Sequence, residues 1–176
     1  MDELKKLIRE VPGFPKPGIN FYDITTLLKH PGGLRTTVQE FARLFHGQVI
    51  DKVVGIESRG FLFGPQVAYE FHAGFVPVRK PGKLPAETVE QSYALEYGLD
   101  RLQMHRDAIS PGERVLIVDD VIATGGTALA GVQLLRQAGA TVEHSLFVID
   151  LPDLGGADAL RAAGVAAEAL IEFSGH

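Results

Sequence analysis

The stretch from Val115 to Thr127 constrains the fold of this chain more than any other part of it. It begins with four apolar, mostly β-branched residues, as expected for a strand that is buried on both faces of a parallel sheet. It ends with threonines and glycines directly before a helical sequence, Ala128 to Ala138, which stops near Gly139. A strand, a loop of small residues and a helix in this order predict a phosphate cradle at a helix N-terminus.

Two neighbouring acids, Asp119 and Asp120, follow the apolar run. Inside a sheet, the alternation of side chains would point one of the two carboxylates into the core, so the pair fits better at the carboxyl end of the strand. Open α/β sheets bind their ligands at that edge. Composition alone leaves an ordinary turn and helix cap open as the alternative, because Asp, Thr and Gly suit both structures.

The rest of the chain repeats the alternation of strand and helix. This pattern predicts an α/β fold, in which a parallel sheet carries helices on both of its faces and the crossovers are right-handed. The expected strands are Val53–Ile56, Phe75–Val78, Val142–Ile149 and Ala169–Phe173, and the expected helices are Leu34–Phe45, Phe61–Phe71 and Ala157–Ala163.

Two segments depart from this rhythm. At the start of the chain we expect a short helix over Asp2–Glu10 and then a stiff irregular loop over Val11–Gly18, which holds three prolines and two glycines. Together they would form a short N-terminal hood. In the long polar region Arg79–Ser110, Leu102 and Met104 alternate with polar residues, so we expect a two-stranded excursion that serves as a flexible active-site lid.

Composition narrows the class of protein. The 176 residues, 45% of them hydrophobic, are enough for one soluble domain that spans residues 1–176, and a formal net charge of −5 argues against a broad nucleic-acid surface. The absence of cysteine excludes a disulfide, a thiolate zinc site and a cysteine nucleophile, and the histidines lack a metal-binding spacing. The sequence has no apolar leader and no run of membrane-spanning length, so we expect a cytoplasmic protein without a membrane partner.

The central stretch resembles the phosphoribosyl pyrophosphate (PRPP) motif of type I phosphoribosyltransferases, an apolar strand, two acids and then Ala-Thr-Gly-Gly-Thr. The resemblance implies that Asp119 and Asp120 hold the ribose hydroxyls of PRPP. It also implies that the loop of Ala123, Thr124, Gly125, Gly126 and Thr127 binds the 5-phosphate. Both roles make chemical sense, because carboxylates accept hydrogen bonds from hydroxyls and backbone N–H groups suit an anion.

Four further segments are similar, in the same order, to the adenine phosphoribosyltransferase family: Phe14–Ile24, Glu57–Gly64, Arg79–Pro85 and Ser92–Gly98. This resemblance implies purine salvage, in which adenine and PRPP give AMP and pyrophosphate, and it implies a homodimer. An enzyme for hypoxanthine, guanine or xanthine remains open as an alternative. So does a PRPP-sensing regulator, although such regulators usually need a DNA-binding element or a basic surface.

The resemblance also assigns residues to the base. Phe21 would stack on adenine while the backbone near Asn20 reads the edge of the base, and Glu96 would act as the acid/base residue. From the residues alone, Phe21 is better explained as a core side chain and Glu96 as a surface charge. The family often has Arg or Lys where this chain has Tyr22, so a contact from that position is in doubt.

The remaining roles concern the phosphates. By the resemblance, Arg59 would bind and neutralise the leaving pyrophosphate, after a Glu57–Ser58 peptide bond that is cis in some members of the family, and Arg79 and Lys83 would face phosphates. Each of these cations, seen alone, also suits a solvated loop. Mg²⁺ would be held mainly through oxygens of PRPP, so we expect no metal site made by the protein alone.

Overall fold

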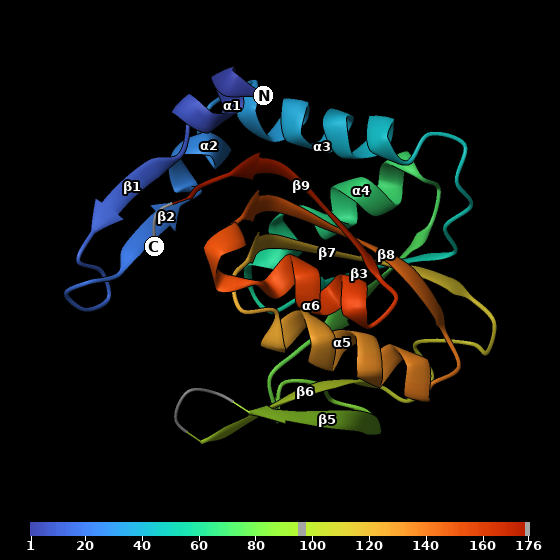
Figure 1. Ribbon diagram of the computed structural model, residues 1–176. Coiled ribbons are helices and arrows are strands. Elements are labelled where there is room, and N and C mark those ends of the chain that lie inside the picture. The colour runs from blue at the N-terminus through green and yellow to red at the C-terminus, as the bar shows by residue number, and fades with distance from the viewer. Residues whose placement is uncertain (95–97, 175–176) are drawn as a thin grey trace.

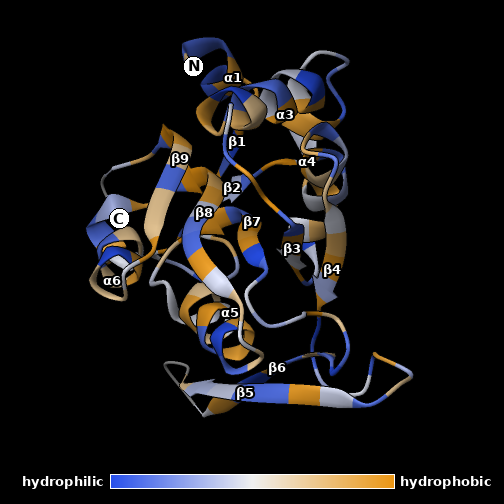
Figure 2. Ribbon diagram, turned by 90° about the vertical axis from the view of Figure 1, so that its right-hand side faces the viewer, coloured by the Kyte–Doolittle hydropathy of each residue, from blue (hydrophilic) through white to orange (hydrophobic). Residues whose placement is uncertain are grey.

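The computed structural model describes residues 1–94 and 98–174, and its centre is a parallel sheet. Every neighbouring pair in this sheet is parallel, which confirms the predicted α/β fold. The strands of the sheet in Figure 1 lie in the order β4 (Gly74–Val78), β3 (Lys52–Ile56), β7 (Arg114–Ile122), β8 (Thr141–Asp150) and β9 (Ala166–Glu172), and all five are labelled in Figure 2.

Helices cover both faces of the sheet, as predicted (Figure 1). Consecutive residues of β7 explain why: Leu116 belongs to one buried cluster and Ile117 to the other, so the strand has to be apolar on both sides. One face carries α3 (Gly33–Leu44) and α4 (Gly64–Glu70), which follows a short 3₁₀ helix, η1 (Arg59–Leu62). The other carries α5 (Gly126–Gln137) and α6 (Gly156–Ala162), which follows the 3₁₀ helix η2 (Pro152–Leu154).

The N-terminal segment differs from the prediction. The helix α1 (Asp2–Lys6) is shorter than expected, and β1 (Arg9–Pro12) pairs antiparallel with β2 (Asn20–Asp23), ahead of a short helix α2 (Thr25–Leu28). The predicted helix was therefore wrong for its last residues, and the predicted irregular loop was wrong at its start. Arg9 aligns with Asp23 and forms an ion pair with it, so a contact between distant residues overrides the local helical pattern.

The long polar insertion forms a hairpin of β5 (Thr88–Ala94) and β6 (Leu99–His105), which confirms the two-stranded excursion. Its alternation is also confirmed, because Leu102 and Met104 are fully buried and join the cluster beneath α5. Figures 1 and 2 place this hairpin and the helices α1 and α3 at opposite ends of the molecule, with the sheet between them. Among the described residues, no helix is long and apolar enough to cross a membrane.

Candidate active site

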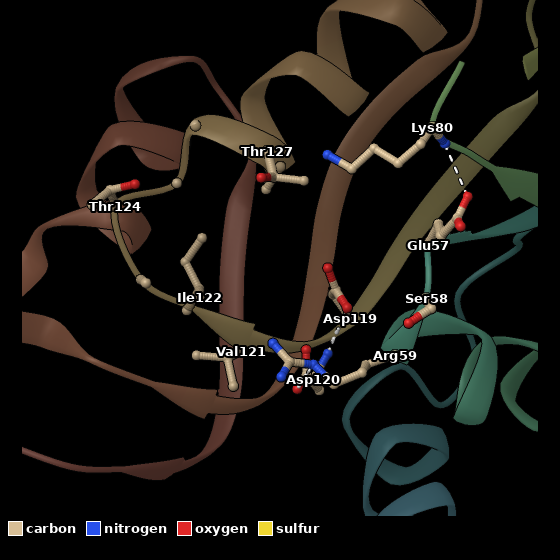
Figure 3. Close-up of a pocket in the computed structure, with 14 residues that line it drawn as sticks. Glu57, Ser58, Arg59, Lys80, Asp119, Asp120, Val121, Ile122, Thr124 and Thr127 are labelled. Carbon is tan, nitrogen blue, oxygen red and sulfur yellow. Dashed lines mark hydrogen bonds and ion pairs between the residues drawn. The ribbon is translucent and has the colours of Figure 1, made fainter. Parts of the chain in front are cut away.

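A cavity of about 470 Å³ opens at the carboxyl end of β3 and β7 (Figure 3). Three parts of the chain line it: the residues just after β3, the end of β7 with the loop into α5, and one lysine before the hairpin. The lining consists of Glu57, Ser58, Arg59, Lys80 and every residue from Asp119 to Ala128. A larger groove of about 620 Å³ lies between α3 and α4, but it holds no comparable pair of acids.

The acid pair lies where β7 outruns one of its neighbours. The pairing of β3 with β7 ends at Gly55 and Val118, whereas β8 accompanies β7 as far as Ile122. Beyond Val118 the chain after β3 no longer pairs with β7 but packs on it at Gly60, where an added Cβ would lie 2.8 Å from the Val118 carbonyl oxygen. The carboxylates are thus inside the strand by sequence but beside the crevice in space, which agrees with their predicted place at the ligand-binding edge.

The two carboxyl groups strongly affect each other. Burial raises the pKa of Asp119 well above its usual value, and the neighbouring Asp120 carboxylate raises it further. Burial also raises the pKa of Asp120, which is only 3% exposed, although the Arg59 guanidinium opposes this rise. The backbone N–H of Asp120 donates to Asp119 Oδ1 at 2.9 Å. Hydroxyl donors or a cation placed at this pair would relieve the crowding of negative charge.

The loop from Ala123 to Thr127 presents backbone N–H groups to the cavity. Gly125 has a left-handed φ of 83°, and no described side chain caps the N-terminus of α5 there. A Cβ on Gly125 would lie 2.9 Å from the Gly156 carbonyl oxygen, and the Gly156 N–H donates to the Ala123 carbonyl at 2.9 Å. The loop therefore rests tightly on the start of α6, and its first-turn N–H groups stay available to an anion.

Arg59 contacts both the acid pair and the hood. Its Nε lies 2.7 Å from Asp120 Oδ2, and its guanidinium carbon lies 5.5 Å from the centre of the Phe21 ring. Phe21 in turn meets Phe14 edge-on at 5.2 Å between ring centres. The ring of Phe21 does not line the cavity, but Arg59 joins it to the cavity. The peptide bond between Glu57 and Ser58 is cis, as the resemblance implied.

The predicted phosphate ligands Arg79 and Lys83 lie outside the lining of the cavity and pair with Glu57. Arg79 Nε is 3.2 Å from Glu57 Oε2, and Lys83 forms an ion pair with the other oxygen. Burial raises the pKa of Glu57, but hydrogen bonds from Lys83, the Lys80 N–H and Arg79 outweigh this effect and leave the pKa below its usual value. Glu57 is therefore an anion that anchors this segment.

Lys80, which no sequence pattern singles out, lines the cavity itself. Its ammonium donates to the Tyr93 hydroxyl at 2.7 Å and forms an ion pair with Asp100. Lys80 stands in the same basic segment as Arg79 and Lys83, and only the direction of each side chain distinguishes the three. No signal in the sequence separates them.

Tyr22, whose role the sequence left open, is a core residue. It is 6% exposed and stacks on Phe173 with 4.0 Å between ring centres, on the opposite side of β2 from Phe21. Asn20 lies on the Tyr22 side, where its Nδ2 donates to the Tyr22 hydroxyl and to Glu10 Oε2, each at 3.3 Å. Glu96 lies outside the described residues.

Comparisons with known proteins agree on one family. The model of the phosphoribosyl transferase domain matches residues 24–158. An adenine phosphoribosyltransferase of Azorhizobium caulinodans is 56% identical over 176 residues, which are 100% of this chain and 98% of the relative. The crystal structure of the adenine phosphoribosyltransferase of Rhodothermus marinus has 52% identity and a TM-score of 0.91, and covers 98% of this chain and 97% of its own.

A third similar protein carries ligands. The adenine phosphoribosyltransferase of Saccharomyces cerevisiae, complexed with an imino-altritol bisphosphate and adenine, is 40% identical with a TM-score of 0.86. The match covers 97% of this chain and 96% of the yeast chain. Thus a structure of this fold holds both a sugar bisphosphate and a purine base.

Proposed function

This chain belongs to the adenine phosphoribosyltransferase family, and from that membership we propose the roles of its residues in the transfer of the 5-phosphoribosyl group of PRPP to adenine. The products are AMP and pyrophosphate. The observation that carries the proposal is one cavity that combines a pair of neighbouring acids with an uncapped helix N-terminus behind a loop of small residues. These are the groups that a sugar diol and a phosphate need.

The ribose 5-phosphate half of the substrate occupies the β7 side of the cavity. Asp119 and Asp120 accept hydrogen bonds from the ribose 2- and 3-hydroxyls, and the N–H groups and hydroxyls of the loop from Ala123 to Thr127 bind the 5-phosphate. Two features support this assignment: the raised pKa values of the acids, which hydroxyl donors would lower, and the tight contact of the loop with α6. Because the ribose hydroxyls and the 5-phosphate are both held, C1 of the ribose is fixed in place for attack by adenine.

The pyrophosphate half lies among cations. Arg59 is free to exchange Asp120 for the leaving pyrophosphate once the ribose hydroxyls occupy the acid pair, and Lys80 already lines the same cavity. Both would neutralise the charge that develops as the C1–O bond breaks. Arg79 and Lys83 remain predicted phosphate ligands, a role that requires them to leave Glu57.

Adenine binds under the hood. Phe21 stacks on the base, and the backbone at Asn20 reads its edge. The position of the Phe21 ring at Arg59 supports this placement, because it puts a base next to the group that holds the pyrophosphate. Glu96 remains the predicted acid/base residue. Its replacement by Ala is expected to lower kcat with little change in the KM of adenine, and an unchanged kcat would remove it from the mechanism.

Mg²⁺ fits this site only as a partner of the substrate. The described residues contain no group of three His, Asp or Glu side chains that could hold a metal ion. Mg²⁺ commonly binds through one or two carboxylates and substrate phosphates, and Asp119 and Asp120 are carboxylates of this kind at the right edge. When bound, the ion supplies positive charge to the diphosphate.

The test is an assay with Mg²⁺, PRPP and one nucleobase at a time. We expect adenine to give AMP and pyrophosphate, and hypoxanthine, guanine and xanthine to give no more than a small fraction of that rate. Equal rates with a 6-oxopurine would overturn the assignment of adenine.

We also propose a homodimer, and light scattering would measure its mass. The cytoplasmic location stays a prediction.

A further inference from the structure

One tyrosine of the hairpin connects the two phosphate-binding parts of the cavity. The Tyr93 hydroxyl accepts a hydrogen bond from Lys80 Nζ at 2.7 Å and one from Thr127 Oγ1 at 3.5 Å, and it donates to Asp100 Oδ2 at 3.0 Å. A tyrosine hydroxyl has one proton to give and two lone pairs to accept with. All three are in use, so the hydroxyl ties a lysine of the cavity to the 5-phosphate loop.

The position of this hydroxyl is set by packed elements. Tyr93 and Asp100 are opposite one another in the antiparallel pairing of β5 and β6. The Tyr93 ring packs against the core at the start of α5, where a Cβ added to Gly126 would lie 3.8 Å from Tyr93 Cδ2. A second bond, from Gln137 Nε2 to Gln91 Oε1 at 2.6 Å, joins the same strand to the end of α5. The hydroxyl is thereby fixed relative to the loop.

Lys80 depends on this arrangement for its direction. Its side chain is flexible and about one-third exposed, and it reaches across the cavity from the segment before the hairpin toward Thr127 (Figure 3). Burial lowers the pKa of Lys80, but its bonds to Asp100 and Tyr93 outweigh this effect and raise the pKa. Without the hydroxyl, Asp100 and the face of the Tyr93 ring, whose centre lies 5.3 Å from Lys80 Nζ, would still hold the ammonium, but no contact among the described residues would join it to the loop.

We propose that Tyr93 is a positioning residue for PRPP, whose hydroxyl holds Lys80 over the cavity and links it to Thr127. The Tyr93 hydroxyl would then orient two donors, Lys80 and Thr127. Binding of the 5-phosphate at the loop would therefore favour binding of the pyrophosphate at Lys80, and the reverse. This inference rests on the proposed function, since it assigns the phosphates of PRPP to the two sides of Tyr93.

The first test replaces Tyr93 by Phe, which removes the hydroxyl and keeps the ring against α5. We expect the KM of PRPP to rise about five-fold, the size of one net hydrogen bond to a charged group at a partly exposed site. The KM of adenine and the melting temperature should stay unchanged. Tyr69→Phe is the matched control, because Tyr69 is 80% exposed in α4 and does not line the cavity. Its KM values should equal those of the wild type.

A double-mutant cycle with Lys80→Met then asks whether Tyr93 acts through Lys80. If it does, Tyr93→Phe adds almost nothing to the rise in the KM of PRPP that Lys80→Met causes alone. Effects that simply multiply would overturn the proposal, as would a single variant that raises the KM values of adenine and PRPP equally. Calorimetric titration of the same four proteins with inorganic pyrophosphate and Mg²⁺ repeats the cycle without turnover. A wild type that binds pyrophosphate but makes no AMP would contradict the proposed function and leave the Tyr93 cycle measurable.

Discussion

Arg59 touches both proposed halves of the site, the Asp120 carboxylate on one side and the Phe21 ring on the other. Its charge favours the ionised form of Asp120, against a burial that favours the neutral form. An arginine suits this place because its guanidinium is planar and keeps its charge even when half-buried. The same side chain therefore favours the ionised form of an acid in the proposed sugar site and lies against the ring of the proposed base site.

We expect Arg59→Met to reduce kcat/KM for PRPP at least about ten-fold, because a charge-assisted contact to the pyrophosphate is lost. The pKa of Asp120 should also rise further without the guanidinium, so the acidic limb of the profile of kcat/KM against pH should move to higher pH. Arg59→Lys is the control, since it keeps the charge and should keep the limb nearly in place. A limb that does not move in Arg59→Met would contradict the coupling.

Asp119→Asn should separate function from stability. The folded-state pKa of Asp119 is raised, so the folded protein binds a proton there more tightly than the unfolded chain, and stability decreases as the pH rises through that pKa. At pH 8 the asparagine variant should therefore melt at a higher temperature than the wild type. The difference should vanish below the usual pKa of 3.8. The KM of PRPP should rise because the amide is a poorer acceptor for the ribose hydroxyls. A lower melting temperature at pH 8 would contradict the burial argument.

At the scale of elements, runs of β-branched residues and the positions of glycine predicted most of the fold. Val53–Ile56 and Val115–Val118 are buried on both faces, which leaves few sequences other than apolar ones. The strand β1 could not be predicted, because Arg9 to Pro12 has no alternation and its pairing with β2 depends on residues some distance along the chain. For the same reason the direction of Lys80 and the stacking of Tyr22 on Phe173 were beyond the sequence.

The loop from Ala123 to Thr127 gives the prediction at the scale of elements. Gly125→Ala should destabilise the protein by about 1–2 kcal/mol from its left-handed φ alone, and by more because a Cβ would lie 2.9 Å from the Gly156 carbonyl oxygen. The KM of PRPP should rise with it. Gly155→Ala is the matched control, since Gly155 has a φ of 73° but no atom within 4 Å of the added Cβ. Chemical denaturation would compare the two. Equal losses would mean that the close approach to α6 contributes nothing.

At the scale of the molecule, residues near the start of the chain contact residues at the end of the part that the structure describes. Tyr22 of β2 stacks on Phe173, which follows β9, and Lys5 Nζ lies 4.5 Å from the centre of the same ring. Lys5 also donates to the Glu172 carbonyl at 2.6 Å. The hairpin that presents Phe21 therefore rests on residues near the C-terminus, which no local pattern in the sequence reveals. Its predicted cover over the base depends on this support.

We expect Phe173→Leu to raise the KM of adenine more than that of PRPP, because the hood loses its stacking partner while the β7 side of the cavity keeps its contacts. A loss of about 1–1.5 kcal/mol in stability should accompany it. Phe45→Leu, in the same buried cluster but away from the hood, should cost similar stability and change neither KM selectively. Steady-state kinetics with each substrate varied would show the difference. Equal changes in both KM values for Phe173→Leu would contradict the idea.

The unequal lengths of β3 and β7 have a consequence for how the sequence of such a protein can evolve. The pairing of β3 with β7 ends at Val118, whereas β7 continues to Ile122. The residues of β7 that line the cavity therefore come from the part of the strand beyond its pairing with β3, and the core packing before that point is left intact. The packing of the sheet and the lining of the cavity thus depend on different residues of β7. Substitutions in the hood and the hairpin can change the substrate, while Val115 to Val118 continue to specify the fold.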